Sequence, residues 1–386
     1  MSSQTLLGRL FVASRPLSWV NTAYPFAAAY LLGGGGIDAA LVVGTIFFLI
    51  PYNLAMYGIN DVFDYESDAV NPRKGGVEGA LLPPSVHRTV LVVATALCVP
   101  FVVALVLLGN PASWAVLAVS LFAVAAYSVR GLRFKEIPFL DSITSSTHFA
   151  SPAVYGLVLA GAAWDRTAVL ALSAFFLWGL ASHAFGAVQD VVPDREGGIA
   201  SIATVLGAAT TVRLALALWL VAGVLLLFLP FPGWLTGLLA LPYLALAWPY
   251  RSVSDAASGR ANRGWRRFLL VNYLVGFAVT LVLIAIAFRG GRRRTHSHST
   301  SRPNDSTRSA SATPWTAVTT LRQQRNGSAP FRHGRSPGRC LPRMEPVRRE
   351  RHVVAPVVPG APPSPDAAVW PMDAFRDRFF SAFSPG

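Results

Sequence analysis

Nine apolar segments, each close to the length of a membrane-spanning helix, dominate the first 288 residues of the chain. A helix needs about 20 predominantly apolar residues to cross the hydrocarbon core of a bilayer. The sequence therefore predicts an all-α, polytopic membrane protein built as a bundle of nine transmembrane helices. The nine segments lie at residues 10–32, 39–59, 88–108, 112–129, 142–162, 167–188, 212–230, 233–249 and 267–288.

Composition agrees with a membrane protein and excludes an ordinary soluble domain. Only 13% of the residues are charged, and the mean hydropathy is +0.46. Soluble domains carry about 25% charged residues. The chain has two cysteines, Cys98 and Cys340, far apart in the sequence. Their number and separation predict neither a disulfide framework nor a cysteine metal site.

The net charge of +14 belongs mainly to the end of the chain. Residues 289–386 contain 17 arginines and six acidic residues, together with many serines and prolines. Such a composition cannot bury a core. We therefore expect a membrane domain at residues 1–288, followed by a tail that is disordered or not a native domain. A basic arm that binds anionic surfaces and the product of a shifted reading frame both fit the tail, and no nucleic-acid partner is expected.

Basic residues are distributed unequally between the loops that alternate along the nine segments. Fifteen fall on one side and only Arg166 falls on the other. Cytoplasmic loops carry the excess of Lys and Arg in membrane proteins. We therefore expect a multi-pass protein of the plasma membrane whose long loops and N-terminus are cytoplasmic. The fifteen residues are Arg9, Arg15, Arg73, Lys74, Arg88, Arg130, Arg133, Lys135, Arg195, Arg213, Arg251, Arg260, Arg263, Arg266 and Arg267.

Three aspartates follow the second apolar segment. Asp61, Asp64 and Asp68 are spaced by three and four residues, so a helix places them on one face. Three carboxylates on one face repel each other unless water or a cation surrounds them. Carboxylate oxygens are the ligands that Mg²⁺ prefers, usually completed by substrate phosphates. The stretch predicts either a metal site or a solvated acidic helix end.

A second acidic pair follows the sixth segment. Asp190 and Asp194 are four residues apart, and the second and sixth segments run in the same direction. The two halves thus resemble weak repeats that deliver carboxylates to one membrane face. Two facing clusters can hold two or more Mg²⁺ ions bridged by a diphosphate. Pro193 between the aspartates predicts a kink or a new helix that begins there.

Basic residues accompany both clusters. Arg73 and Lys74 follow the first, Arg195 lies within the second, and the stretch 127–135 supplies more after the fourth segment. Such side chains either donate to diphosphate oxygens or serve only as determinants of topology.

Together these motifs resemble the UbiA-type intramembrane prenyltransferases over residues 10–288. The resemblance rests on Asn-Asp-x-x-Asp-x-x-x-Asp at Asn60–Asp68, Asp-x-x-x-Asp at Asp190–Asp194, and the Tyr-Ser…Arg-x-Lys loop at Tyr127–Lys135. Within that superfamily, His183–Ile199 is most similar to the lycopene elongases, which make C50 carotenoids. One position departs from the pattern, because many members have a lysine where this chain has Gly131.

The resemblance implies a central cavity open sideways to lipid and a site for Mg²⁺ and a prenyl diphosphate. Catalytic roles fall to Asp64, Asp190 and Asp194. The implied Mg²⁺ ligands are Asp61, Asp64, Asp68, Asp190 and Asp194. The implied diphosphate-binding residues are Asn60, Arg73, Lys74, Tyr127, Arg130, Arg133, Lys135 and Arg195.

The predicted function is Mg²⁺-dependent transfer of a dimethylallyl group from its diphosphate to lycopene, with release of diphosphate. The expected partners are the allylic diphosphate, lycopene, the lipid bilayer and other enzymes of carotenoid synthesis. A prenyltransferase with an aromatic acceptor, as in quinone-type biosynthesis, is the alternative. Apart from Arg15, no basic residue lies within a segment to anchor an aromatic acid, which favours the apolar acceptor. A cation transporter fits less well, because transport sites lie near the bilayer midplane.

Further residues have both a chemical and a structural interpretation. His183 and Asp141 are candidates for the proton acceptor, with helix packing and helix capping as the alternatives. Aromatic faces can shield an allylic cation, although most aromatic side chains in a bundle only pack. The aromatic candidates are Tyr24, Tyr52, Tyr57, Phe63, Phe149, Tyr155 and Phe185.

Overall fold

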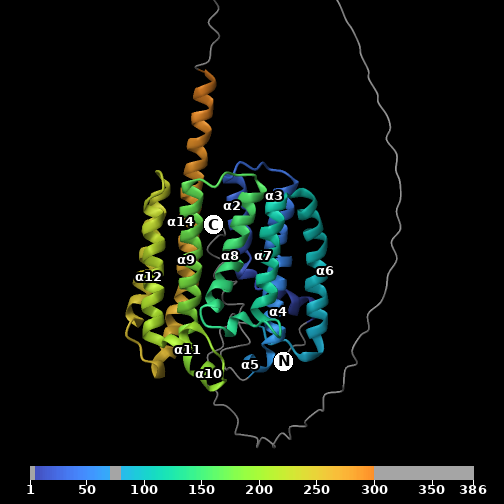
Figure 1. Ribbon diagram of the computed structural model, residues 1–386, viewed down its shortest axis with the longest axis vertical. Helices are drawn as coiled ribbons and strands as arrows, with labels where there is room; N and C mark the ends of the chain where they lie inside the picture. Colours follow the sequence, from blue (N-terminus) through green and yellow to red (C-terminus); the bar gives the residue numbers. More distant parts are fainter. Residues whose placement is uncertain (1–4, 70–79, 300–386) are drawn as a thin grey trace, which may run out of the picture. The chain divides into compact units, whose positions relative to one another are not determined.

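The computed structural model describes residues 5–69 and 80–299, with side chains to Arg289 apart from that of Ser67. Every regular element in these ranges is a helix, which confirms the all-α prediction. The long helices lie side by side in a bundle (Figure 1). Arg73, Lys74 and nearly all of the predicted tail lie outside the described residues.

Within the described residues, six helical stretches are long and apolar enough to cross a membrane. The prediction of nine is therefore not confirmed. Ala39–Phe63 combines α3 (Ala39–Leu49) with α4 (Pro51–Phe63), and Asp255–Arg289 combines η5 (Asp255–Arg260) with most of α14 (Ala261–Ser299). The other four are α6 (Pro84–Leu108), α7 (Pro111–Ser128), α9 (Arg166–Val188) and α12 (Ala208–Leu227).

The first predicted segment is broken near its start. It forms α1 (Leu6–Ala13), the short 3₁₀ helix η1 (Pro16–Ser18) and α2 (Val20–Leu32). Arg15 has a φ of 49°, in the left-handed region, and Pro16 supplies no backbone N–H. The break turns the Arg15 side chain into the bundle.

The fifth predicted segment forms one long helix, but a polar one. Helix α8 (Leu140–Leu159) packs against α2, α7 and α9, and buries serine, threonine and histidine side chains among them. The Ser146 hydroxyl, for example, donates to the backbone carbonyl of Phe176 at 2.6 Å. Because its partners are other helices and not lipid, α8 needs no continuous apolar surface.

The eighth predicted segment is irregular. It forms the 3₁₀ helix η3 (Gly233–Ala240), α13 (Leu241–Ala247) and η4 (Trp248–Tyr250). Pro242 and Pro249 stand in the first turns of α13 and η4, where proline is tolerated, but neither can continue a preceding helix.

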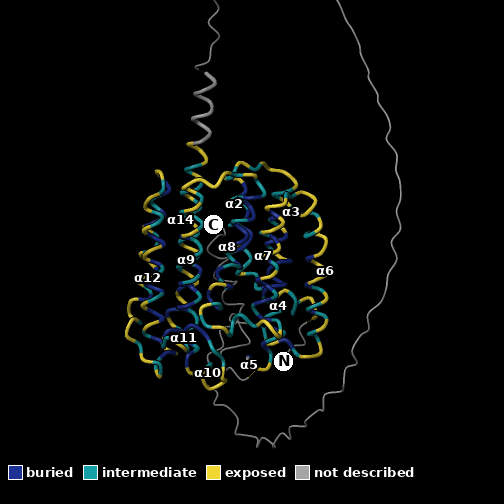
Figure 2. Tube along the Cα trace, viewed as in Figure 1, coloured by how far each residue is buried: buried dark blue, intermediate teal, exposed yellow. Residues whose placement is uncertain are grey.

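Two apolar cores hold the described part of the bundle together. One is centred on Phe26, Phe48 and Tyr52, and the other on Trp219 and Phe268. Large apolar side chains are exposed on α6, α12 and α14. Figure 2 shows exposed residues along the length of these helices. Short helices, among them α5 (Tyr65–Ala69), α10 (Val191–Glu196) and α11 (Ile202–Leu206), gather at one end of the bundle (Figure 1).

Candidate active site

The first aspartate cluster lies where α4 passes into α5. Asp61 is in α4, Asp64 is its C-cap and Asp68 is in α5. The backbone N–H of Asp64 donates to Asn60 (2.9 Å) and that of Asp68 donates to Asp64 (2.8 Å), so the helical path continues. The three aspartates are only 1%, 6% and 7% exposed. Their burial disagrees with a solvated acidic helix end, and agrees with carboxylates that meet cations.

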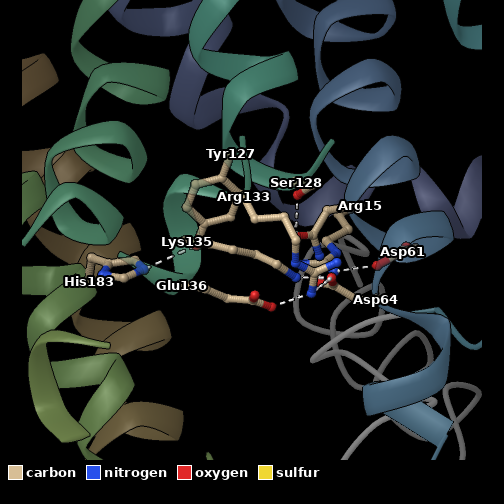
Figure 3. A network of polar contacts seen from close by, with 10 residues as sticks. Arg15, Asp61, Asp64, Tyr127, Ser128, Arg133, Lys135, Glu136 and His183 are labelled. Carbon is tan, nitrogen blue, oxygen red and sulfur yellow. Dashed lines mark hydrogen bonds and ion pairs between the residues drawn. The ribbon is translucent and has the colours of Figure 1, made fainter. Parts of the chain in front are cut away.

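Arg15 provides one of these cations. Its Nη2 lies 2.8 Å from Oδ1 of Asp61 (Figure 3). Its guanidinium carbon lies 4.3 Å from the centre of the Tyr57 ring. Sequence reasoning counted Arg15 only as a determinant of topology and missed this contact. The sequence does hold a signal for this contact, the Arg15-Pro16 pair. A residue before proline is disfavoured in a helix, so the pair predicts a break in the first segment at Arg15.

Lys135 provides the second cation. It forms an ion pair with Asp64, and Nη2 of Arg133 lies 3.9 Å from the same carboxylate (Figure 3). Arg133 also pairs with Glu136. Arg130 is exposed at the start of this loop. Gly131 has a φ of 93°, where a lysine would be strained, so the basic contacts come from positions further along the loop.

Lys135 also connects the two aspartate clusters electrostatically. Burial lowers the pKa of Lys135 to about 8, whereas Glu136, Asp194 and Asp61 raise it. The carboxylates that favour the charged form of Lys135 thus include one from each cluster, Asp61 and Asp194.

The second cluster lies between α9 and α10. Asp190 precedes α10, and the N–H of Asp194 donates to the Asp190 carbonyl at 2.8 Å. Both aspartates are half-buried. The predicted break in the helix is present and a new helix forms, but α10 begins at Val191, two residues before Pro193. Proline is accommodated at the third helical position since the first N–H groups of a helix have no intrahelical partner.

The contacts of Arg195 connect neighbouring helices. Its guanidinium donates to Asp255 (2.6 Å) and to the Thr204 carbonyl (2.6 Å). Asp255 also accepts from the N–H of Ala208 at 2.7 Å. These contacts fasten α10 to the start of α12. They position the Asp194 loop without directing Arg195 at the other predicted diphosphate-binding residues.

Polar side chains from three helices surround the clusters. The Ser128 hydroxyl donates to Oδ1 of Asn60 at 2.9 Å, which fixes the asparagine beside Asp61. His183 lies between the hydroxyls of Tyr127 (3.1 Å to Nε2) and Ser142 (3.0 Å to Nδ1). Both ring nitrogens therefore have hydroxyl partners, and Figure 3 shows the contact with Tyr127.

Asp141 is fully buried and accepts two backbone hydrogen bonds. The N–H of Ser142 donates to one oxygen at 2.6 Å, and the N–H of Ile202 donates to the other at 2.8 Å. The second bond caps α11. The predicted role as N-cap of its own helix is not what the structure shows, because the N-cap of α8 is Phe139 and Asp141 lies in the first turn.

The aromatic candidates divide into packing residues and residues near the clusters. Tyr52, Tyr155 and Phe185 are completely buried in the two cores. Tyr57 stacks on Arg15, next to Asp61. The remaining three, Tyr24, Phe63 and Phe149, are half-buried.

The donor set fits Mg²⁺, although the described side chains do not form a complete metal cage. No three His, Cys, Asp or Glu side chains of the described ranges gather closely enough to hold a metal. Arg15 and Lys135 lie against the carboxylates instead. Protein sites for Mg²⁺ usually supply one or two carboxylates and leave the other positions to water and substrate phosphates. Two separated groups of hard oxygen ligands, one buried and one half-buried, match that pattern.

Arg15→Gln is expected to destabilise the protein by about 2 to 4 kcal/mol. Removing one member of a buried ion pair leaves the other charge without its partner, and the Arg15 side chain is 21% exposed. Arg15→Lys should lose less, because it keeps the charge but not the flat guanidinium on Tyr57. Thermal unfolding in detergent measures this, with Arg9→Gln as the control. Equal melting temperatures for Arg15→Gln and the control would contradict the role of the pair.

Comparisons with known proteins agree with this arrangement. The sequence model of the UbiA prenyltransferase family matches residues 22–274. The chain is 57% identical over 280 residues to the C(50) beta-cyclic carotenoids biosynthesis protein LbtBC of Dietzia sp.. That alignment covers 72% of this chain and 65% of the Dietzia protein, which is less than two thirds of its length. The chain is also 53% identical over 277 residues to a lycopene elongase/hydratase of Corynebacterium glutamicum, covering 72% of this chain and 96% of the relative.

Solved structures show the same fold at low sequence identity. A UbiA homolog from Archaeoglobus fulgidus, bound to DMAPP and Mg²⁺, is 16% identical with a TM-score of 0.51. The match covers 69% of this chain and 98% of that structure. A homolog from Aeropyrum pernix is 20% identical with a TM-score of 0.50, covering 68% and 97%. The resemblance to lycopene elongases predicted from the motifs is thus confirmed by independent matches.

Proposed function

Because the chain belongs to the UbiA prenyltransferase family, we propose that it transfers a dimethylallyl group from its diphosphate to lycopene. The protein is a multi-pass membrane enzyme of the prenyltransferase class. The observation that carries the proposal is the buried first aspartate cluster with Lys135 paired to Asp64. Relatives named lycopene elongase/hydratase support the acceptor, and a homolog bound to DMAPP and Mg²⁺ supports the donor and the metal.

The proposed Mg²⁺ ligands are the two aspartate clusters. When bound, Mg²⁺ neutralises diphosphate oxygens, which makes the diphosphate a better leaving group. Asp64 and Asp61 are paired with cations in the structure. We propose that these pairs loosen when a diphosphate arrives, so that Lys135 and Arg133 donate to its oxygens. Their charge then stabilises the departing group as it becomes more negative. The complete ligand set is Asp61, Asp64, Asp68, Asp190 and Asp194.

Other predicted residues take supporting roles in this proposal. Arg73 and Lys74 donate to the diphosphate from the loop after the first cluster. Asn60, held by Ser128, orients the first cluster. Arg195 holds the Asp194 loop through Asp255.

The bond changes follow from the substrates. The carbon–oxygen bond of the allylic diphosphate breaks, and the terminal alkene of lycopene supplies the electron pair for the new carbon–carbon bond. The tertiary cation that results then loses a proton or takes up water. The apolar bundle excludes other water from this step. We propose His183 as the proton acceptor and not Asp141, because His183 is partly exposed whereas Asp141 is fully buried and caps α11.

We also propose which part of the chain is catalytic and which side of the membrane the aspartate clusters face. Residues 1–288 form the catalytic domain, with a central cavity open to lipid, and residues 289–386 are dispensable. The aspartate clusters and the N-terminus face the cytoplasm at the plasma membrane. The bias of basic residues supports this orientation.

Expression of the full chain in lycopene-producing cells is expected to convert lycopene into C45 and C50 products. Pigment analysis by chromatography and mass spectrometry measures the conversion. Membranes from the same cells should release diphosphate from dimethylallyl diphosphate only when Mg²⁺ is present. Diphosphate release with unchanged lycopene would favour an aromatic acceptor. An absence of release with either acceptor class would contradict the proposed reaction.

A further inference from the structure

Four arginines surround an open pocket at the beginning of α14. The pocket has a volume of about 560 Å³ and is lined by Arg260, Asn262, Arg263, Arg266, Arg267 and Leu270. We call it the arginine pocket. All four arginines are exposed. None forms an ion pair with a carboxylate within the part of the chain that the structure describes. The pocket therefore has an excess of positive charge that the described residues do not neutralise.

The charge ends abruptly where the apolar part of α14 begins. No charged residue occurs between Arg267 and Arg289, and this stretch belongs to a candidate membrane span with no buried residues in its most apolar window. The arginine pocket thus lies at the level where the helix passes from the aqueous phase into the hydrocarbon core. Phosphate groups of lipids lie at this level.

The pocket continues into an apolar stripe on the same face of α14. Arg263, Arg267, Leu270, Leu274 and Phe277 are separated by four, three, four and three residues, so they follow one face of the helix. Leu270, Leu274 and Phe277 are 63%, 61% and 64% exposed. From Arg267 to Phe277 the helix rises about 15 Å, which is about half of the hydrocarbon thickness.

From this arrangement we propose that the arginine pocket binds the headgroup of an anionic glycerophospholipid. The planar guanidinium groups take the phosphate oxygens in pairs, and an acyl chain of the same lipid lies along Leu270, Leu274 and Phe277. A free diphosphate would use the arginines but not the apolar stripe. The combination of both on one helix face favours the lipid.

The bound lipid would lie close to the second aspartate cluster. Asn262 lines the pocket, and its amide donates at 2.6 Å to Oε1 of Gln189, the residue before Asp190. The proposal does not depend on the identity of the prenyl acceptor, and its test requires no turnover.

Lipid binding to the purified full-length protein tests the proposal. The protein is placed in nanodiscs of phosphatidylcholine with increasing phosphatidylglycerol, and the retained lipids are counted by native mass spectrometry. Arg263→Gln/Arg267→Gln removes two pocket arginines. Arg9→Gln/Arg88→Gln removes the same charge outside the pocket. Arg263→Lys/Arg267→Lys keeps the charge but not the paired N–H groups, and melting temperatures verify that each variant folds.

We expect the parent protein and the Arg9/Arg88 variant to retain phosphatidylglycerol in preference to phosphatidylcholine. The Arg263→Gln/Arg267→Gln variant should lose about thirtyfold in this preference, the factor expected for two arginine–phosphate contacts. The lysine variant should fall between them. Equal losses in both glutamine variants would show a general effect of surface charge and overturn the proposal. Displacement of the lipid by millimolar inorganic diphosphate would also overturn it, because the pocket would then take soluble diphosphates.

Discussion

Asp64→Asn is expected to lower prenyl transfer by about 10³-fold or more, because a metal-bound leaving group is stabilised by several kcal/mol. Asp64 is central in the first cluster, only 6% exposed, and it is the carboxylate that pairs with Lys135. The amide keeps the size of the side chain but loses the negative charge that a cation requires. Diphosphate release and C50 product formation both measure the effect.

Glu66→Gln is the matched control for this substitution. Glu66 is exposed on α5, two residues further along the chain, so its loss should change activity little. Asp64→Asn also leaves Lys135 without its partner, so a fall in stability is a second expected consequence. The double variant Asp64→Asn/Lys135→Met removes both charges and should recover stability without recovering activity. Substantial activity in either Asp64 variant would show that the catalytic carboxylates lie elsewhere.

Lys135→Met is expected to lower kcat/KM by about 10²-fold. Lys135 is the described cation on which carboxylates of both clusters act, and its side chain is only 13% exposed. Removing one preorganised charge-stabilising donor typically costs about 10² to 10³ in rate. Initial rates of diphosphate release at varied dimethylallyl diphosphate concentration give kcat and KM separately.

Two arginine substitutions show whether the effect of Lys135→Met depends on the position of the lost charge. Arg133→Met should cost less, because Arg133 is farther from Asp64 and pairs with Glu136. Arg88→Met, on the exposed start of α6, should leave the rate unchanged. A loss for Lys135→Met no larger than that for Arg133→Met would remove Lys135 from its proposed role.

The helical class and the two aspartate clusters could be predicted from the sequence because both depend on local spacing. Apolar stretches of spanning length predict helices, and aspartates three and four residues apart share a helix face whatever surrounds them. The structure keeps Asp61, Asp64 and Asp68 on one helical path across the junction of α4 and α5. Asp190 is the N-cap of α10 and Asp194 lies within that helix.

The contacts between distant residues could not be predicted from the same spacing. Arg15 meets Asp61 across 46 positions of sequence, and Asn60 meets Ser128 across 68. No periodicity encodes such pairs, because they depend on how helices pack. The contact between Arg195 and Asp255, which are 60 residues apart, could not be predicted for the same reason.

The number of membrane-spanning helices could not be predicted by counting apolar segments. The hydropathy of a helix reflects how much of its surface contacts lipid, and α8 has little such contact. Helix α8 buries its polar side chains against α2, α7 and α9. The opposite case is α14, whose most apolar window is 0% buried inside the protein. A helix with polar residues inside a bundle and a helix exposed to lipid therefore require different sequence patterns.

The polar face of α8 has a consequence for how the chain is made. A helix that exposes several hydroxyl groups and a histidine enters a bilayer poorly by itself, because each polar group loses water without gaining a partner. Helices α2 and α7, against which α8 packs, are synthesised earlier, and α9, which provides partners for Ser142 and Ser146, follows directly. We therefore expect α8 to leave the insertion machinery together with its neighbours, as one assembly step, so that the interior of the enzyme forms during biogenesis and not after it.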